Sequence, residues 1–133
     1  VPHNSPYASE ESVRLQDFAH EDFNSLSGSR SIRTICDRYC MQAGFVPHII
    51  YESDSPDTVK NLIASGLGVG FWPHYTWGMD SMEQIRLMPI AEPTCQRAII
   101  LQLHRHARGQ EAVCSFYAFL SRYLRQLKAA EQH

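Results

Sequence analysis

Two short polar turns contain residue types that bind a small anion. Ser27-Gly28-Ser29-Arg30-Ser31 precedes one expected helix, and Asp54-Ser55-Pro56 precedes another. The first backbone N–H groups of a helix have no partner within it, and the helix dipole makes this end positive. If both helices follow parallel strands, the two turns lie at the same edge of the sheet. The sequence therefore predicts a site for a small anion, such as a carboxylate, at that edge.

The cysteines and histidines suggest other chemistry, but their surroundings favour structural roles. Cys36 and Cys40 are four residues apart, on one face of an expected helix, where a disulfide would distort the helix. No lysine flanks either thiol to activate it, so buried structural thiols are favoured over a redox switch. His104 and His106 are two residues apart, but no carboxylate or cysteine pattern completes a metal site. We expect these histidines to be solvated or to cap local structure, and we expect no metal.

An enzyme would need residues that this chain does not combine. The serines of the expected loops are not accompanied by a paired His and Asp motif. The glycine-rich segment Gly66-Leu67-Gly68-Val69-Gly70 follows an expected helix instead of opening one, so it lacks the context of a phosphate-binding loop. Its glycines are better explained as a helix stop and as positions where the next strand packs closely. We therefore expect no catalytic residues and no cofactor.

The elements that would position these residues alternate between strands and helices. Apolar residues recur at helical spacing over 32–43, 56–65 and 111–129. Ser55 is suited to cap the second of these helices, and Gly66 to end it. β-branched and aromatic runs predict a strand-and-turn entry over 13–19, a buried strand over 48–52, and further strands over 23–26, 68–72, 85–88 and 98–103. The order indicates an α/β fold with parallel neighbours in its sheet.

The composition is that of an ordinary globular protein and argues against binding along a nucleic acid. The chain has 133 residues, with 12 Lys and Arg against 14 Asp and Glu. Residues 1–96 carry a net charge of −6 and residues 97–133 a net charge of +4. An acidic body with a basic tail cannot wrap a phosphate backbone over a broad surface.

The sequence also indicates in which cellular compartment the protein is expected. No apolar run approaches the roughly 20 residues that cross a bilayer, and no secretory signal is visible. The four Cys residues follow no ordered pattern, which favours free thiols in the cytoplasm. The N-terminus lacks an initiator Met, so we expect it to be cut or processed.

A series of short motifs resembles the effector-binding domain of LysR-type transcriptional regulators. In chain order they are Ala43-Gly44-Phe45-Val46-Pro47, Tyr51-Glu52-Ser53, Val59 to Ala64, and Gly66-Leu67-Gly68-Val69-Gly70-Phe71-Trp72-Pro73. The flanking segments 15–18, 21–23, 92–93 and 97–99 also resemble family landmarks at the expected intervals. Because the motifs are collinear over most of the chain, the resemblance is specific.

The resemblance implies an α/β effector domain like the type II periplasmic binding proteins, which have two lobes. Residues 1–12 would be a lead-in or crossover, 13–96 the second lobe, and 97–133 the return crossover with a strand and the C-terminal helix of the first lobe. We expect the opening half of the first lobe and the helix-turn-helix region to be missing, so DNA would be bound only through a region absent from this chain. The implied role is that of a cytoplasmic sensor, not an enzyme, in which a small-molecule effector controls a DNA-binding oligomer. The alternatives are a solute-binding protein of transport and a thiol-based redox sensor on the same scaffold.

The resemblance also places the effector cleft at the sheet edge described above. The expected ligand-binding residues are Ser27, Ser29, Arg30, Glu52, Ser53, Phe71 and Trp72. Arg30 is a candidate for a two-pronged hydrogen bond to an anionic effector. The alternative is that the serines are ordinary caps, that the aromatic residues belong to the core, and that Arg30 is solvated or paired with a neighbouring carboxylate.

The C-terminal segment carries a large apolar surface that needs a partner. Its residues are Ile99, Ile100, Leu101 and Leu103 on the expected strand and Val113, Phe116, Leu120, Leu124 and Leu127 on the expected helix. Left in water, they would form an exposed patch beside an unpaired strand edge. We expect a homodimer or higher oligomer with residues 97–127 at its centre, or a helix that folds back onto the second lobe.

Overall fold

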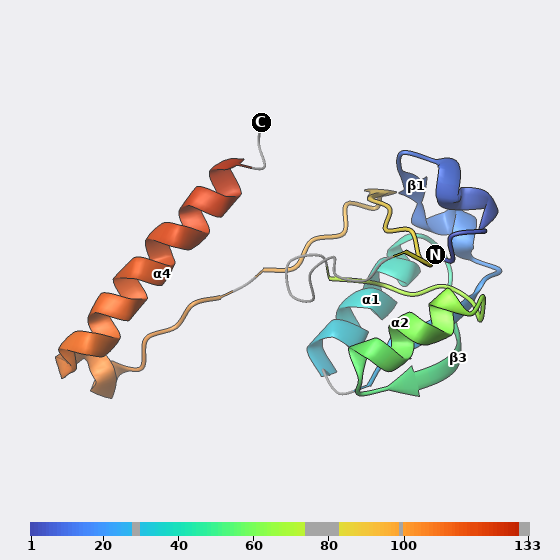
Figure 1. The fold of residues 1–133 in the computed structure, drawn as a ribbon. Helices are drawn as coiled ribbons and strands as arrows, with labels where there is room; N and C mark the ends of the chain where they lie inside the picture. The colour runs from blue at the N-terminus through green and yellow to red at the C-terminus, as the bar shows by residue number, and fades with distance from the viewer. Residues whose placement is uncertain (28–29, 74–82, 99, 131–133) are drawn as a thin grey trace. The chain divides into compact units, whose positions relative to one another are not determined.

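The chain divides into two compact units, Val1–Gln96 and Arg97–His133. The computed structural model describes residues 1–27, 30–73, 83–98 and 100–130. No described helix is long and apolar enough to span a membrane. Among the described residues, the first unit contains two strand pairs and two α-helices, and the second contains a long α-helix (Figure 1).

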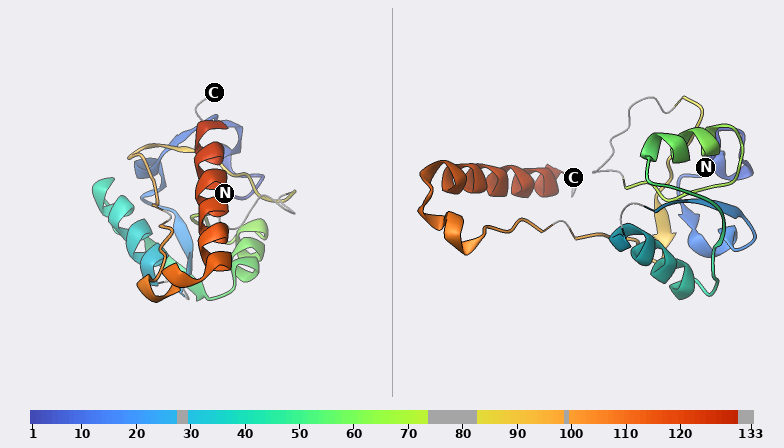
Figure 2. Two further views of the ribbon diagram at one scale, coloured as in Figure 1. Left: turned by 90° about the vertical axis from the view of Figure 1, so that its left-hand side faces the viewer. Right: turned by 90° about the horizontal axis from the view of Figure 1, so that it is seen from below.

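The first unit is built around the parallel strands β2 (Asp22–Leu26) and β3 (His48–Ser53). Helix α1 (Arg30–Gln42) connects the two strands, and α2 (Pro56–Ala64) follows β3. In both views of Figure 2, α1 and α2 lie on opposite sides of β2. The order and parallel pairing of these elements confirm the expected α/β architecture.

Local sequence signals explain where the helices stop and start. The Ser55 hydroxyl accepts a hydrogen bond from the Thr58 N–H at 3.3 Å and caps α2, while Pro56 occupies the first helical position. After α1 and α2, Gly44 and Gly66 adopt φ of +87° and +84°, a conformation that favours glycine. These predicted boundaries are confirmed.

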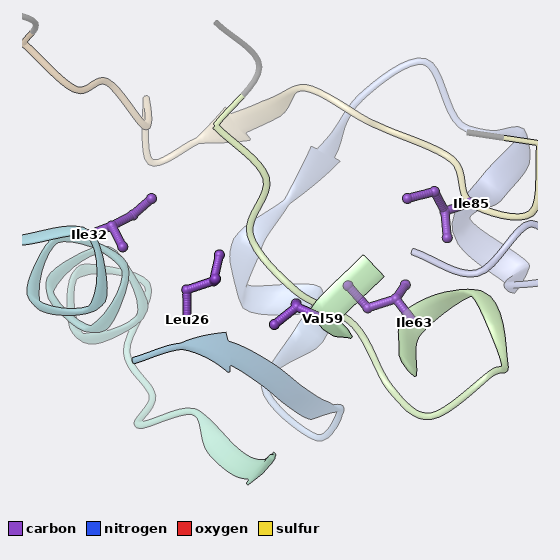
Figure 3. Packing of buried hydrophobic residues seen from close by; sticks show 5 residues of the cluster. All are labelled: Leu26, Ile32, Val59, Ile63 and Ile85. Carbon is purple, nitrogen blue, oxygen red and sulfur yellow. The ribbon is translucent and has the colours of Figure 1, made fainter. Parts of the chain in front are cut away.

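Two apolar clusters form the core of the first unit. In one, Leu26 at the end of β2 lies between Ile32 of α1 and Val59 of α2, with Ile63 and Ile85 completing the contact (Figure 3). The other surrounds Phe23 and includes Val13, Phe18 and Val69. Because Phe23 and Leu26 anchor different clusters, β2 is the central packing element of the unit.

The expected strand-and-turn entry over 13–19 is confirmed as strand β1 (Val13–Arg14) followed by the 3-10 helix η2 (Leu15–Phe18). The preceding lead-in contains another 3-10 helix, η1 (Pro6–Ser9).

The strand predictions over 68–72 and 85–88 are wrong in extent. Val69 makes one parallel bridge to Phe23, and Ile85 makes one antiparallel bridge to Pro2. Gly68 has φ of +82°, which interrupts the extended backbone that a longer strand needs. The longer pairing occurs further along the chain, where β4 (Ile90–Glu92) runs parallel to β1.

The prediction that β3 is a buried strand is also wrong. Ile50 is 41% exposed and Tyr51 is 51% exposed. Among the described residues, β3 pairs with β2 alone, so its other side is a sheet edge. A β-branched and aromatic run is typical of edge strands as well as buried ones, because such a run does not indicate how many neighbouring strands will pair with it.

In the second unit, the 3-10 helix η3 (Arg105–Gly109) leads into α4 (Glu111–Ala130), which confirms the predicted C-terminal helix. The strand predicted over 98–103 is wrong for the described residues of that segment, which exclude residue 99. A strand exists only when a neighbouring strand accepts and donates its hydrogen bonds, and no described residue pairs with this segment.

Candidate functional site

The carboxyl ends of β2 and β3 lie next to each other, as the site prediction requires. Leu26 is in register with Ser53, and the Ser27 N–H donates a hydrogen bond to the Ser53 carbonyl oxygen at 2.9 Å. Ser27 is exposed and Ser53 is half-buried, so both lie at an accessible edge. The structure therefore brings these two predicted residues together at the start of both helices.

The serines after β3 are partly engaged in capping. The Ser53 hydroxyl accepts a hydrogen bond from the Ser55 N–H at 3.1 Å, and Ser55 caps α2. Asp57 adds a negative charge to the first helical turn. The interpretation of Ser55 as a cap is confirmed, and the positive end of α2 is already partly compensated by the chain's own groups.

The start of α1 is described only from Arg30 onward. Ser29 lies outside the described residues, and the helix begins at Arg30, whose side chain is likewise not described. Ligand contacts by Ser29 and Arg30 therefore stay predictions.

Glu52 forms an ion pair with a basic residue that was not among the predicted site residues. Its carboxylate forms an ion pair with the Arg33 guanidinium on the second turn of α1. Arg33 Nε also donates to both carboxylate oxygens of Asp37, at 2.9 and 2.8 Å. The i, i+4 spacing of Arg33 and Asp37 was readable from the sequence, whereas the pairing with Glu52 depends on the tertiary fold. Glu52 therefore joins β3 to α1 at the proposed site.

Phe71, one of the two predicted aromatic residues, packs against the apolar core of the first unit. Phe71 stacks on Phe23, with ring centroids 5.9 Å apart and planes inclined by 24°, and both belong to the core around β2. Phe71 also lines a small cavity of about 20 Å³ together with Arg33 and Asp37. That volume accommodates about one water molecule. Trp72 is half-buried. The core interpretation of Phe71 is supported by this packing.

A larger depression lies elsewhere on the first unit. It has a volume of about 290 Å³ and is formed by the second half of α2 and residues 83–85. Lys60 and Glu83 contribute opposite charges to its wall. The depression involves none of the predicted ligand-binding residues, and no sequence signal identified it.

The thiols have the character of packing groups. All four cysteines are free, and Cys40 is fully buried. Burial raises the pKa of Cys36 and of Cys40 to about 12 and that of Cys95 to about 11. Because the thiolate is the reactive form, these values favour structural thiols over a redox switch.

The histidines of the second unit serve a local purpose. His104 caps η3 by accepting a hydrogen bond from the His106 N–H at 3.4 Å, and the two rings stack with centroids 5.0 Å apart. The predicted capping role is confirmed. Within the part of the chain that the structure describes, no group of three or more His, Cys, Asp or Glu residues could hold a metal ion.

Comparison with known proteins identifies the scaffold. The family described as LysR substrate binding domain matches residues 1–125. The chain belongs to this family. It is the LysR effector-binding domain, which is not enzymatic, and its fold is the α/β fold of that domain.

Individual relatives agree with the family match. The chain is 26% identical over 128 residues to the transcriptional dual regulator GltC of Bacillus subtilis (strain 168), covering 96% of this chain and 43% of GltC. The PA01 protein of Pseudomonas aeruginosa superposes with a TM-score of 0.77 at 20% identity, over 93% of this chain and 44% of that one. The effector binding domain of QuiR in complex with shikimate gives a TM-score of 0.68 at 20% identity, over 92% of this chain and 58% of that one. The chain thus spans less than half of GltC.

Proposed function

We propose that this LysR domain binds a small carboxylate at the carboxyl edge of β2 and β3, where Ser27 and Ser53 meet. The observation that carries the proposal is the hydrogen bond from the Ser27 N–H to the Ser53 carbonyl, which brings the two helix starts to one edge. Helix starts present N–H donors and positive dipole ends to an anion. Arg33 supplies a guanidinium nearby, already oriented by Glu52 and Asp37.

The relatives support the ligand class. Shikimate, bound by the effector binding domain of QuiR, is a small carboxylate. In this proposal Ser27, Ser29, Arg30 and Ser53 contact the effector, and Glu52 acts through Arg33. Phe71 and Trp72 form the apolar floor behind them. The bound effector stabilises one arrangement of a longer, cytoplasmic regulator, and a DNA-binding region outside this chain reads the change.

Calorimetric titration tests this proposal. Shikimate and a panel of aliphatic and aromatic carboxylates are compared with their uncharged methyl esters. We expect binding by at least one carboxylate and no binding by its ester. Ser53→Ala should weaken that binding, whereas Ser65→Ala at the far end of α2, where the hydroxyl donates to the Leu62 carbonyl, should not. Equal binding of an acid and its ester, or equal effects of the two variants, would refute the site.

We further propose that two copies of the chain associate through α4. Phe116 is 63% exposed and Phe119 is 59% exposed, and both lie with Tyr123 on one face of the helix. At about 200 Å² per aromatic side chain, these three residues expose roughly 350 Å², against about 800 Å² on each partner of a stable interface. The dimer should therefore dissociate on dilution.

Light scattering over a concentration series measures this association. Phe116→Ser should lower the apparent mass at high concentration, and the control Ile50→Ser, which also removes an exposed apolar side chain, should not. A monomer at every concentration, or a dimer that survives Phe116→Ser unchanged, would contradict the assignment to α4.

A further inference from the structure

Tyr39 of α1 forms hydrogen bonds with the backbone at the end of the first unit. The Tyr39 hydroxyl donates a hydrogen bond to the Gln96 carbonyl oxygen at 2.6 Å and accepts one from the Gln96 N–H at 2.8 Å. A single side chain thus satisfies both backbone polar groups of a residue 57 positions away, as a neighbouring strand would. The Arg38 guanidinium lies 5.5 Å from the centre of the Tyr39 ring, which favours this ring position.

The position of Gln96 gives this contact its significance. Gln96 is the last residue of the first unit, and Arg97 is the first of the second. Gln96 is therefore attached to α1 immediately before the chain leaves the first unit.

The other end of α1 reaches the proposed effector edge. The helix begins at Arg30, three residues beyond Ser27, and Arg33 ties it to Glu52 at the end of β3. Tyr39 is less than two helical turns further along. A rigid helix fixed at both places can carry a displacement from one to the other.

We propose that Tyr39 is a positioning residue that fixes where the chain leaves the first unit, so that a shift of α1 at the effector edge moves Gln96 and the start of the second unit. The importance of that edge rests on the proposed function. The anchoring itself rests on the two hydrogen bonds of Tyr39.

Amide hydrogen exchange and chemical shifts of the ¹⁵N-labelled chain test the proposal. Tyr39→Phe removes the hydroxyl and keeps the ring, and Tyr51→Phe is the matched control on the exposed face of β3. Since the hydrogen bond that protects the Gln96 N–H contributes about 0.5 to 1.5 kcal/mol, Tyr39→Phe should speed exchange of that amide by about 2- to 13-fold. Tyr51→Phe should leave it unchanged. Unchanged amide shifts of α2 would show that the first unit stays folded.

A second arm tests transmission along α1 without any effector. Glu52→Gln weakens the attachment of Arg33 at the edge and should shift the Gln96 and Arg97 amides. In the Tyr39→Phe background the same substitution should leave these two amides in place. Equal exchange of Gln96 in the wild type and Tyr39→Phe would overturn the proposal, as would Glu52→Gln shifts that are absent or identical in both backgrounds. A failed carboxylate titration would refute the proposed function and leave this result intact.

Discussion

Replacing Gly68 with Ala should cost far more stability than replacing Gly66, although the two glycines have nearly the same backbone conformation. Their φ angles are +82° and +84°. A Cβ at Gly66 meets no atom within 4 Å, whereas a Cβ at Gly68 lies 2.3 Å from the Asp22 carbonyl oxygen. That oxygen also accepts a hydrogen bond from the Val69 N–H at 2.8 Å. The steric overlap would therefore disrupt the hydrogen bond that joins residues 68–69 to β2.

The expected magnitudes follow from these two differences. A left-handed conformation costs a non-glycine residue about 1 to 2 kcal/mol, and this term is common to both variants. The overlap at Gly68→Ala adds about 1 to 3 kcal/mol, because the neighbouring atom is backbone and cannot rotate away. We therefore expect Gly68→Ala to lower the free energy of unfolding by about 2 to 5 kcal/mol in all.

Urea unfolding of the two variants measures the difference directly. With an m-value of about 2 kcal/mol/M, a difference of about 2 kcal/mol between them separates their midpoints by about 1 M. Coincident midpoints would mean that residues 66–70 do not approach β2 as closely as the structure shows.

Three further outcomes are expected. Alkylation of Cys36 by iodoacetamide should keep accelerating about tenfold per pH unit beyond pH 10, because burial raises the pKa of this thiol to about 12; a plateau below pH 10 would contradict this. Folding disfavours the thiolates of Cys36 and Cys40, so the free energy of unfolding should be at its full value below pH 9 and fall as the pH rises toward 12. Urea unfolding as a function of pH should show a smaller loss in the double variant Cys36→Ala/Cys40→Ala. Ser55→Ala should cost about 1 kcal/mol in the same assay through loss of the α2 cap, and no measurable change would show that the Thr58 N–H finds another acceptor.

Signals carried by local sequence predicted much of the first unit. The limits of α1 and α2 follow from the helical spacing of apolar residues and from Ser55 and Pro56 at the start of α2. They also follow from the glycine with positive φ that comes after the C-terminus of each helix. The parallel pairing of β2 and β3 follows from the alternation of strands and helices. The meeting of Ser27 and Ser53 then follows, because carboxyl ends of parallel strands share an edge.

The wrong predictions concern which segments pair with each other in the fold, and a single sequence does not specify this. The run 48–52 is apolar enough for a central strand, yet among the described residues β3 is an edge strand with Ile50 and Tyr51 exposed. The segment 98–103 has strand composition, but its described residues pair with no described strand. The ion pair between Glu52 and Arg33 was not predicted, because Arg33 is 19 positions away in the chain and only the fold brings their charges together.

The central claim is that the effector binds at the β2–β3 edge, and an amide chemical-shift map with a saturating carboxylate tests it most directly. We predict the largest shifts at Ser27, Ser53 and Ser55, with small shifts across α4. Shifts concentrated instead in residues 111–130, or around the depression formed by Lys60 and Glu83, would contradict it.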